Sequence, residues 1–376
     1  MGIQIVGLAC LFRFAFFRLP KTEGMKFPGV SVIKSCHTAV DHEEENFIQF
    51  FEQEYPGPYQ LIFTVSNRTD TVVPVIEKVM AMYPKVDSKL VISTRHESFL
   101  KKVDALHDAH DHVKHPFVIW SDSDTWVEKN YVQLMSASLQ EPGVSVVTTP
   151  QYDWKVNTVV GAWKSLANNA DMATSIMLMD TFTKDKRVAW GQSIGFNNEE
   201  FKSFGDKPWK LINHFMADDQ ALAISFSDQG KKVVFKNIYC PVWFTDKKLA
   251  NVFEQKIRWL PLQRIPFGGN RLIYLVMVPL GYPLIIAFIY ALLRGFTPDA
   301  WALMGATVIQ RLCASLIFEM LIVRSATVFL KYFWTIPLWD LSQIYFIIHG
   351  FFKTTSTYHG KRFKVVNKYF FEEISS

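Results

Sequence analysis

The chain changes character near residue 271, and this change limits what it can fold into. Residues 25–250 mix charged and apolar side chains, whereas residues 271–352 are dominated by Leu, Ile, Val, Phe and Tyr. Hydrophobic residues make up 49% of the 376 residues and are therefore concentrated in one part of the chain. The pattern predicts a globular domain joined to a membrane-associated segment.

In residues 25–250, short apolar runs alternate with segments whose apolar residues recur at helical spacing. This alternation, with polar residues where the strands end, predicts an open α/β sheet. Ligands of such sheets bind outside the carboxyl ends of the strands. The expected strands are Gly29–Lys34, Tyr59–Val65, Lys89–Ser93, Phe117–Trp120 and Val144–Thr148, and the expected helices are Glu43–Gln53 and Val73–Tyr83.

Three later stretches are apolar enough to be considered as membrane spans. They are Leu272–Leu293, Trp301–Val323 and Thr327–Phe352. The second carries Arg311 and the third Asp340, and ionisable residues at such positions usually have a functional or paired role. If all three stretches crossed the membrane, the globular domain and the basic tail would lie on opposite sides of it. A re-entrant or interfacial third stretch is therefore an equal alternative.

The chain therefore divides into five expected parts. These are a short anchor or interfacial helix (1–24), an α/β domain (25–250), an interfacial helix region (251–270), transmembrane or interfacial helices (271–352) and a basic cytosolic tail (353–376). The net charge of +5 is too small to indicate nucleic-acid binding, and basic residues gather beside the apolar segments, as they do on cytoplasmic faces. Four widely spaced cysteines indicate neither disulfides nor a zinc site.

Acidic residues follow the strands of the predicted sheet. Asp122 and Asp124 end one strand, and two carboxylates at this spacing can hold a divalent cation against phosphate oxygens. Asp219 begins an apolar helix, where a partly desolvated carboxylate suits a general base. A turn pair and a helix N-cap are the simpler alternatives for these two features.

Gln255, Arg258 and Trp259 share one face of a predicted helix. Arg supplies paired donors for a diphosphate, and Trp supplies a flat surface for a sugar or lipid headgroup. An interfacial Arg/Trp belt before a membrane span is the alternative. The residues between His107 and His115 form a dense His/Asp cluster, which we interpret as a solvated connection before the Phe117 strand rather than a metal site.

In this order, the motifs resemble the ceramide glucosyltransferase family, inverting membrane enzymes with a GT-A fold and the signature D, D, D, (Q/R)xxRW. The likeness runs from about residue 25 to residue 365. Residues matching the family pattern are Asp70, Asp122, Asp124, Asp219 and Gln255-Lys256-Ile257-Arg258-Trp259, with Lys34, Pro150, Gly191-Gln192-Ser193 and the tail His359–Phe363 in support. Lys102-Val103-Asp104-Ala105-Leu106 lacks both Asn residues of the family's Lys-Val-Asn-Asn-Leu stretch.

The resemblance implies specific roles for these residues. Asp219 and Arg258 would be catalytic, and Asp122 with Asp124 would hold Mg²⁺ or Mn²⁺. Donor binding would fall to Lys34, Asp70, Lys102, Asp122, Gln255, Arg258 and Trp259, and the acceptor side to Trp259, Gly191, Gln192 and Ser193.

The implied reaction transfers glucose from UDP-glucose to the hydroxyl of ceramide, giving glucosylceramide, at a membrane with the catalytic domain in the cytosol. The membrane would be Golgi or endoplasmic reticulum in a eukaryote and the inner membrane in a bacterium. Alternatives are transfer of a hexose or N-acetylhexosamine to a glycerolipid or hopanoid-type lipid, and a non-catalytic membrane scaffold of the same fold.

Overall fold

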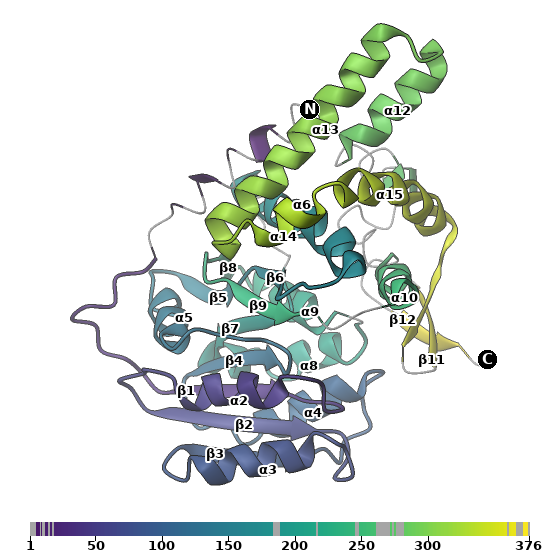
Figure 1. Ribbon diagram of the computed structural model, residues 1–376. Coiled ribbons are helices and arrows are strands. Elements are labelled where there is room, and N and C mark those ends of the chain that lie inside the picture. The colour runs from purple at the N-terminus through teal and green to yellow at the C-terminus, as the bar shows by residue number, and fades with distance from the viewer. Residues whose placement is uncertain are drawn as a thin grey trace. The chain divides into compact units, whose positions relative to one another are not determined.

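The computed structural model describes residues 5–7, 9, 12–13, 16, 19–182, 189–215, 217–244, 248–260, 271–272, 274–275, 282–358, 361–365 and 371–374 (Figure 1). Eleven of the 24 residues of the predicted N-terminal anchor, all of residues 261–270 and His359-Gly360 of the tail motif lie outside the described residues. The chain forms two compact units. Unit 1 comprises Met1–Phe16, Asp153–Thr181 and Phe244–Ser376, and unit 2 comprises Phe17–Tyr152 and Phe182–Trp243.

Unit 2 is built on a seven-stranded mixed sheet in the order β3-β2-β1-β4-β7-β5-β8 (Figure 1). β1 lies parallel to both β2 and β4, and β2 is parallel to β3, so the carboxyl ends of these four strands meet at one edge. β7 runs antiparallel between β4 and β5. The strands are β1 Val30–Ser35, β2 Tyr59–Val65, β3 Asp87–Ile92, β4 Phe117–Asp122, β5 Val144–Thr148, β7 Ser193–Asn197 and β8 Lys232–Phe235.

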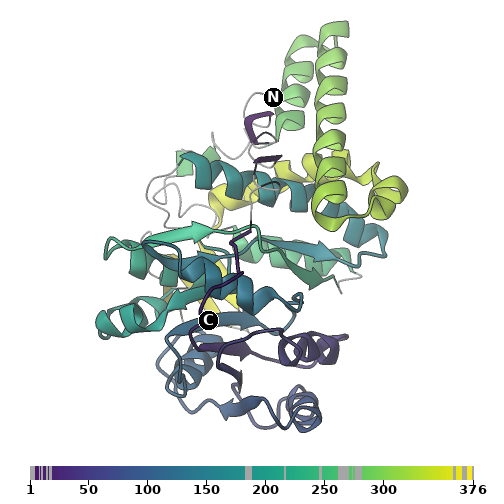
Figure 2. The ribbon, with the colours of Figure 1, turned by 90° about the vertical axis from the view of Figure 1, so that its left-hand side faces the viewer.

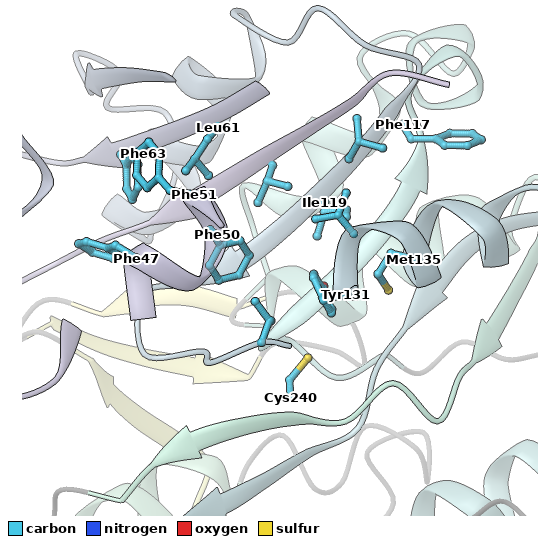
Figure 3. Close-up of a cluster of buried hydrophobic side chains, with 14 of the residues drawn as sticks. Phe47, Phe50, Phe51, Leu61, Phe63, Phe117, Ile119, Tyr131, Met135 and Cys240 are labelled. Atoms are coloured by element: carbon cyan, nitrogen blue, oxygen red, sulfur yellow. The ribbon is translucent and has the colours of Figure 1, made fainter. Parts of the chain in front are cut away.

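Helices cover both faces of this sheet. The helices of unit 2 are α2 Glu43–Phe51, α3 Val73–Met82, α4 Lys101–His110, α5 Tyr131–Leu139, α7 Asn198–Ser203, α8 Lys207–Ile212 and α9 Asp218–Ser227. On α2, Phe47, Phe50 and Phe51 fall at helical spacing and pack with Phe63 and Tyr131 in the core (Figure 3). Complete burial of each such side chain stabilises the fold by about 1.5–3 kcal/mol.

The opposite face of the sheet carries a second aromatic cluster. Trp120 of β4 contacts Phe196 of β7, Phe201 of α7 and Trp209 of α8, with ring centroids 5.2, 6.4 and 5.7 Å away. Because successive residues of a strand point to opposite faces, Ile119 packs into the core on one face of the sheet and Trp120 into the aromatic cluster on the other. The two layers hold the sheet, and with it the strand ends, in a fixed position.

Unit 1 is mainly helical. It contains α6 Val159–Phe182, α10 Leu249–Trp259, α12 Pro283–Arg294, α13 Pro298–Phe318, the π-helical turn Glu319–Val323, α14 Thr327–Tyr332 and α15 Thr335–Phe352, followed by the three-stranded sheet β10 Thr355–Tyr358, β11 Lys361–Val365 and β12 Phe371–Ile374. Helices α12 and α13 lie side by side in both ribbon views (Figures 1 and 2). A further pair of strands, β6 Gln151–Trp154 and β9 Cys240–Trp243, lies where the chain passes between the two units.

A buried ion-pair triad connects three helices within unit 1. The guanidinium of Arg311 on α13 donates to both oxygens of Asp340 on α15, at 2.7 and 2.8 Å. It also donates to both oxygens of Asp171 on α6. Arg311 and Asp340 are 3% and 0% exposed. Removing one member of such a group leaves an uncompensated buried charge, so the triad fixes how α6, α13 and α15 pack.

The predicted α/β organisation of residues 25–250 is confirmed in unit 2, where all five expected strands and both expected helices form to within two residues at each end. Within the described residues, one helix, Pro298–Val323, is long and apolar enough to cross a membrane. Thr327–Phe352, expected as one stretch, is divided between α14 and α15. Residues 273 and 276–281 of the first candidate span lie outside the described residues, and α12 covers its second half.

Candidate active site

The register of β1 and β4 sets the position of the acidic loop after β4. Lys34 lies beside Ser121 and Ser35 beside Asp122 in the parallel pair. The last residues of both strands therefore meet at the carboxyl edge of the sheet, as the sequence pattern predicted. The loop Asp122–Thr125 starts from this point.

Lys34 lies beneath this loop and is 0% exposed. Its ammonium donates to the carbonyl oxygens of Asp122 and Thr125 and to Ser121 Oγ, 3.2 Å away. It also lies 4.0 Å from the ring centroid of Phe50. Burial lowers the pKa of Lys34 to about 8, while nearby acidic groups oppose the shift. Lys34 thus supports the acidic loop from inside the core, and its contact with the donor stays a prediction.

Asp122 and Asp124 have an unusual electrostatic environment. Burial raises the pKa of both carboxyls, and the charge of Asp122 adds to the shift of Asp124, whose pKa rises to about 6. Asp124 Oδ1 is buried without a hydrogen-bond partner in the described structure. A hard cation would satisfy this oxygen, so the donor set fits Mg²⁺ or Mn²⁺. Within the described residues no three His, Cys, Asp or Glu side chains are grouped as metal ligands, so two carboxylates would need oxygens from the substrate to complete the shell.

Lys102 joins the acidic loop to the start of α9. Its Nζ lies 2.7 Å from Asp122 Oδ1 and 3.0 Å from Asp218 Oδ2. Burial alone would lower the pKa of Lys102, but the charges of Asp122 and Asp218 outweigh it and raise the pKa well above its usual value. Lys102 was expected in the donor site from the family pattern, whereas nothing in the sequence singled out Asp218 as its partner.

Asp219 is the second residue of α9, and the N-cap of that helix is Ala217, so the alternative of Asp219 as a helix cap is wrong. Burial and the neighbouring charge of Asp218 raise the pKa of Asp219 to about 7. Gly191 lies directly against this carboxylate, because a Cβ built at Gly191 would be 2.8 Å from Asp219 Oδ2. Any larger residue at position 191 would displace the carboxylate, and this explains the glycine.

The two residues after Gly191 have structural contacts. The Gln192 carbonyl accepts a hydrogen bond from the Asp122 amide at 3.0 Å and from Thr125 Oγ1 at 3.1 Å. Ser193 is 0% exposed, and its hydroxyl bonds to that of Tyr131. The predicted acceptor-side segment therefore divides: Gly191 contacts Asp219, Gln192 supports the acidic loop, and Ser193 belongs to the core.

Asp70 stabilises the turn that follows β1. Its Oδ1 accepts from the Thr38 amide at 2.7 Å, and its Oδ2 lies 3.0 Å from His37 Nδ1. Thr38 has a positive φ of 56°, so the carboxylate holds a backbone conformation that few residues adopt alone. The sequence did not identify His37, which is exposed beside this predicted nucleotide-pocket residue.

The Gln255–Trp259 box lies on α10 in unit 1, and it is helical, as the sequence predicted. Gln255 and Arg258 line a pocket of about 300 Å³ together with Asn251 and Glu254. Lys256 faces the other way. Its Nζ lies 4.6 Å from the ring centroid of Trp339 and 3.5 Å from Asn168 Oδ1, and burial lowers its pKa to about 8. Of the residues in the box, Gln255 and Arg258 face the pocket, and Lys256 does not.

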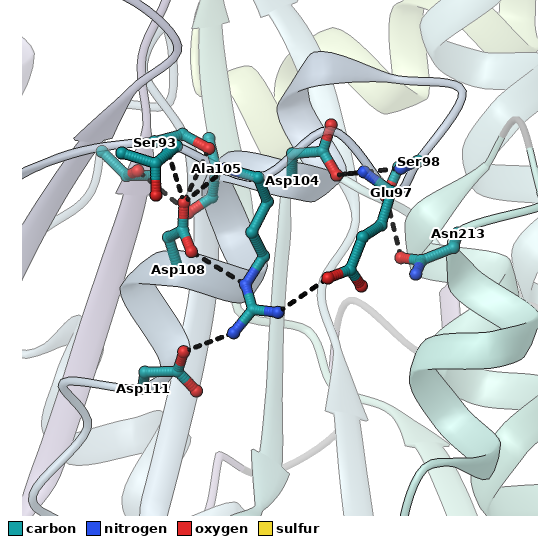
Figure 4. Close-up of polar contacts among 11 residues, drawn as sticks. Ser93, Glu97, Ser98, Asp104, Ala105, Asp108, Asp111 and Asn213 are labelled. Carbon is teal, nitrogen blue, oxygen red and sulfur yellow. Dashed lines mark hydrogen bonds and ion pairs between the residues drawn. The ribbon is translucent and has the colours of Figure 1, made fainter.

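The His/Asp cluster is not the solvated connection that the sequence indicated. His107, Asp108 and His110 belong to α4, and His110 is 7% exposed among aromatic rings of α7 and α8. His107 stacks on Trp209, with ring centroids 3.9 Å apart. The acids pair with Arg95, which lies 2.8 Å from Asp108 and 2.7 Å from Asp111 (Figure 4). The apolar partners of the histidines come from residues 196–209, which local sequence could not reveal.

Carboxylates gathered at the carboxyl edge of an α/β sheet, one of them with a raised pKa, define a candidate catalytic or ligand-binding site. The family is settled by comparison, because the model of glycosyl transferase family 21 matches residues 2–369. The chain belongs to glycosyl transferase family 21. The recognition of this family from its motifs is confirmed, and the α/β sheet and the membership together confirm the predicted class of fold.

Two curated relatives match part of the chain. Ceramide glucosyltransferase 3 from Caenorhabditis elegans is 29% identical over 130 residues, which are 34% of this chain and 28% of that protein. Ceramide glucosyltransferase from Candida albicans is 28% identical over 125 residues, which are 30% of this chain and 23% of that protein. The match thus spans about a quarter of the length of these relatives.

Solved structures of glycosyltransferases also match. The mannosyltransferase PcManGT from Pyrobaculum calidifontis, in complex with GDP-Man and Mn²⁺, has a TM-score of 0.48 and 16% identity over 93% of this chain and 95% of its own. Glucosyl-3-phosphoglycerate synthase from Mycobacterium tuberculosis, with Mn²⁺ and UDP, has a TM-score of 0.39 and 12% identity over 63% of this chain and 78% of its own.

Replacing Lys34 tests whether it supports the acidic loop. Lys34→Met fills the same space but removes the donor of the Thr125 carbonyl and one of the donors of the Asp122 carbonyl, and an unsatisfied buried group costs about 1–3 kcal/mol. We expect a clear fall in melting temperature and weaker UDP binding, measured by thermal unfolding in detergent with and without UDP. Lys26→Met, at an exposed position, is the control. Wild-type stability and UDP affinity in Lys34→Met would exclude this role.

Proposed function

We propose that this protein transfers a hexose, glucose from UDP-glucose, to the hydroxyl of a membrane lipid, ceramide, with inversion at the anomeric carbon. The observation that carries the proposal is the convergence of Asp122, Asp218 and Asp219 around Lys102 at the sheet edge, with Asp219 poised near neutral pH. Family membership supports the reaction class. The names of the two partly matching relatives support glucose and ceramide.

The chemistry assigned to these residues is a single displacement. Asp219 accepts the proton of the acceptor hydroxyl as the hydroxyl oxygen bonds to the anomeric carbon. The bond from that carbon to the β-phosphate oxygen breaks, and its electron pair leaves with UDP. A carboxylate with a pKa near 7 is an effective base because it is substantially ionised and still basic at neutral pH. Gly191 leaves room for the carboxylate in this position.

Charge on the departing diphosphate needs compensation. Asp122 and Asp124 would hold a divalent cation, which when bound would neutralise the phosphate oxygens. Lys102 supplies a further positive charge from α4. We also assign Arg258, with Gln255 and Trp259, to this donor end, in line with the family signature, because a guanidinium matches a diphosphate through paired hydrogen bonds.

The apolar helices of unit 1 suggest how the lipid is reached. We propose that α12 and α13 form a hairpin that enters the bilayer, while α14 and α15 lie at its surface. A hairpin that enters and leaves the bilayer on one side would keep the α/β domain and the basic tail together on the cytosolic side. Leu330 of α14, Trp334 just before α15, and Leu338 and Phe352 of α15 are exposed apolar side chains, which suit an interfacial position.

A direct assay tests the proposed reaction. The full chain in detergent is incubated with radiolabelled UDP-glucose, a total lipid extract and Mn²⁺, and the organic phase is analysed. We expect a labelled lipid that survives mild alkali, because the amide of a ceramide resists the treatment that cleaves the esters of a glycerolipid. An alkali-labile product would identify a different acceptor, and absence of label with every sugar nucleotide would contradict the proposal.

Asp219→Asn tests the base. An amide cannot accept the proton, so turnover should fall by at least about a hundredfold, the scale of general-base catalysis, while UDP affinity stays within about twofold. Initial rates and calorimetric UDP binding provide the two readouts. Asp228→Asn makes the same change at the exposed end of α9 and should leave the rate unchanged. Full activity in Asp219→Asn would remove this residue from the mechanism.

The pH profile should follow the ionisation of Asp219. Because burial and Asp218 raise its pKa to about 7, the base is active above that pH and is lost by protonation below it. We expect kcat/KM to fall about tenfold for each pH unit below 6 and to level off above pH 8. Asp218→Asn removes the neighbouring charge and should move the midpoint to lower pH. A flat profile between pH 5 and 8 would contradict the assignment.

A further inference from the structure

A single ammonium group lies at the position on Asp122 where a cation would bind. Lys102 Nζ is 2.7 Å from Asp122 Oδ1, and it also lies 3.0 and 3.3 Å from the two oxygens of Asp218. The side chains of Lys102 and Asp218 are 23% and 13% exposed, so the contact is largely shielded from water. Such pairs are weakened by solvent far less than surface pairs.

The position of α4 does not depend on this contact. Asp104 accepts hydrogen bonds from the Glu97 and Ser98 amides at 3.0 and 2.9 Å, and Asp108 accepts from the Thr94 amide at 2.7 Å (Figure 4). These bonds fix the segment before α4 to the helix itself. Lys102 lies in the first turn with a long flexible side chain, so its ammonium can move while the helix stays in place.

Asp218 provides a second partner for the ammonium when Asp122 is taken. A divalent cation on Asp122 Oδ1 and an ammonium 2.7 Å from the same atom would repel each other, so they exclude one another there. Lys102 can withdraw toward Asp218 without becoming an unpaired charge. A diphosphate bound at the loop would attract the ammonium further, since it carries several anionic oxygens.

We propose that Lys102 occupies the cation position on Asp122 while the donor is absent and yields it when the nucleotide diphosphate binds. The divalent cation and the nucleotide then bind cooperatively, because the nucleotide gives Lys102 another anionic partner. This inference rests on the proposed function, which places the divalent cation at Asp122 and Asp124.

The test measures Mn²⁺ binding, not activity. Free Mn²⁺ is titrated by electron paramagnetic resonance into the detergent-solubilised full chain, with and without UDP. We expect Lys102→Met to bind Mn²⁺ at least fivefold more tightly than wild type when UDP is absent, and no more tightly when UDP is present. The tightening of Mn²⁺ binding by UDP should therefore shrink in this variant. Lys101→Met removes the exposed neighbouring ammonium and should match wild type.

Each other outcome has a definite meaning. Unchanged or weaker Mn²⁺ binding in Lys102→Met without UDP overturns the proposal. If Lys102→Met tightens Mn²⁺ binding equally with and without UDP, the substitution acts through a general effect of charge, and this result also overturns the proposal. If neither wild type nor Lys102→Met binds Mn²⁺ even with UDP, the cation assignment in the proposed function fails as well. If UDP tightens Mn²⁺ binding equally in wild type and in Lys102→Met, the Lys102 inference alone fails. Lys102→Gln, checked by thermal unfolding, serves if the methionine variant misfolds.

Discussion

The buried ammonium of Lys34 is the contact on which the arrangement of the acidic residues depends. The parallel register of β1 and β4 places it under the loop, where it donates to the carbonyls of Asp122 and Thr125. Without this donor the Thr125 carbonyl would lose its partner, a cost of about 1–3 kcal/mol, and the Asp122 carbonyl would keep only the Thr125 amide and the Ser121 hydroxyl, at 3.3 and 3.4 Å. The Asp122 amide of the loop in turn donates to the Gln192 carbonyl, and the adjacent Gly191 lies against Asp219. One lysine in the core is thus connected, through the acidic loop and Gly191, to the carboxylate of Asp219.

Carboxylates at such short range would repel one another strongly, and the protein resolves this in two ways. Two unit charges 4 Å apart interact by about 4 kcal/mol at the effective dielectric of a partly buried site. Asp122 and Asp218 share the ammonium of Lys102. Burial also disfavours the charged forms: it raises the pKa of Asp122, and it raises the pKa values of Asp124 and Asp219 to about 6 and about 7. The same desolvation that makes Asp219 costly to ionise would suit it to the proposed role of a base at neutral pH.

The sequence revealed the features that local pattern controls. Strand ends, the helix that begins at Asp218 and the helical Gln255–Trp259 box followed from periodicity, and the order of the motifs identified the family. It could not reveal contacts made by residues distant in the chain. The burial of His110 depends on Trp209, and the partner of Lys102 lies at Asp218. Lys34 showed the same limit, because a lysine ending a strand can face solvent or the core, and only the neighbouring strand decides which.

The Arg311 triad explains why the apolar helices cannot be treated as a simple anchor added to a complete domain. An arginine in an apolar helix is costly in hydrocarbon unless it is paired, and Arg311 pairs with Asp340 of α15 and with Asp171 of α6. Helix α6 is encoded between β6 and β7, within the α/β half of the sequence, yet it belongs to unit 1. Removing the chain beyond residue 270 would therefore leave Asp171 without its partner and the buried face of α6 uncovered. Helix α6 therefore depends on the apolar helices of unit 1 for its packing, although the sequence encodes it within the α/β half.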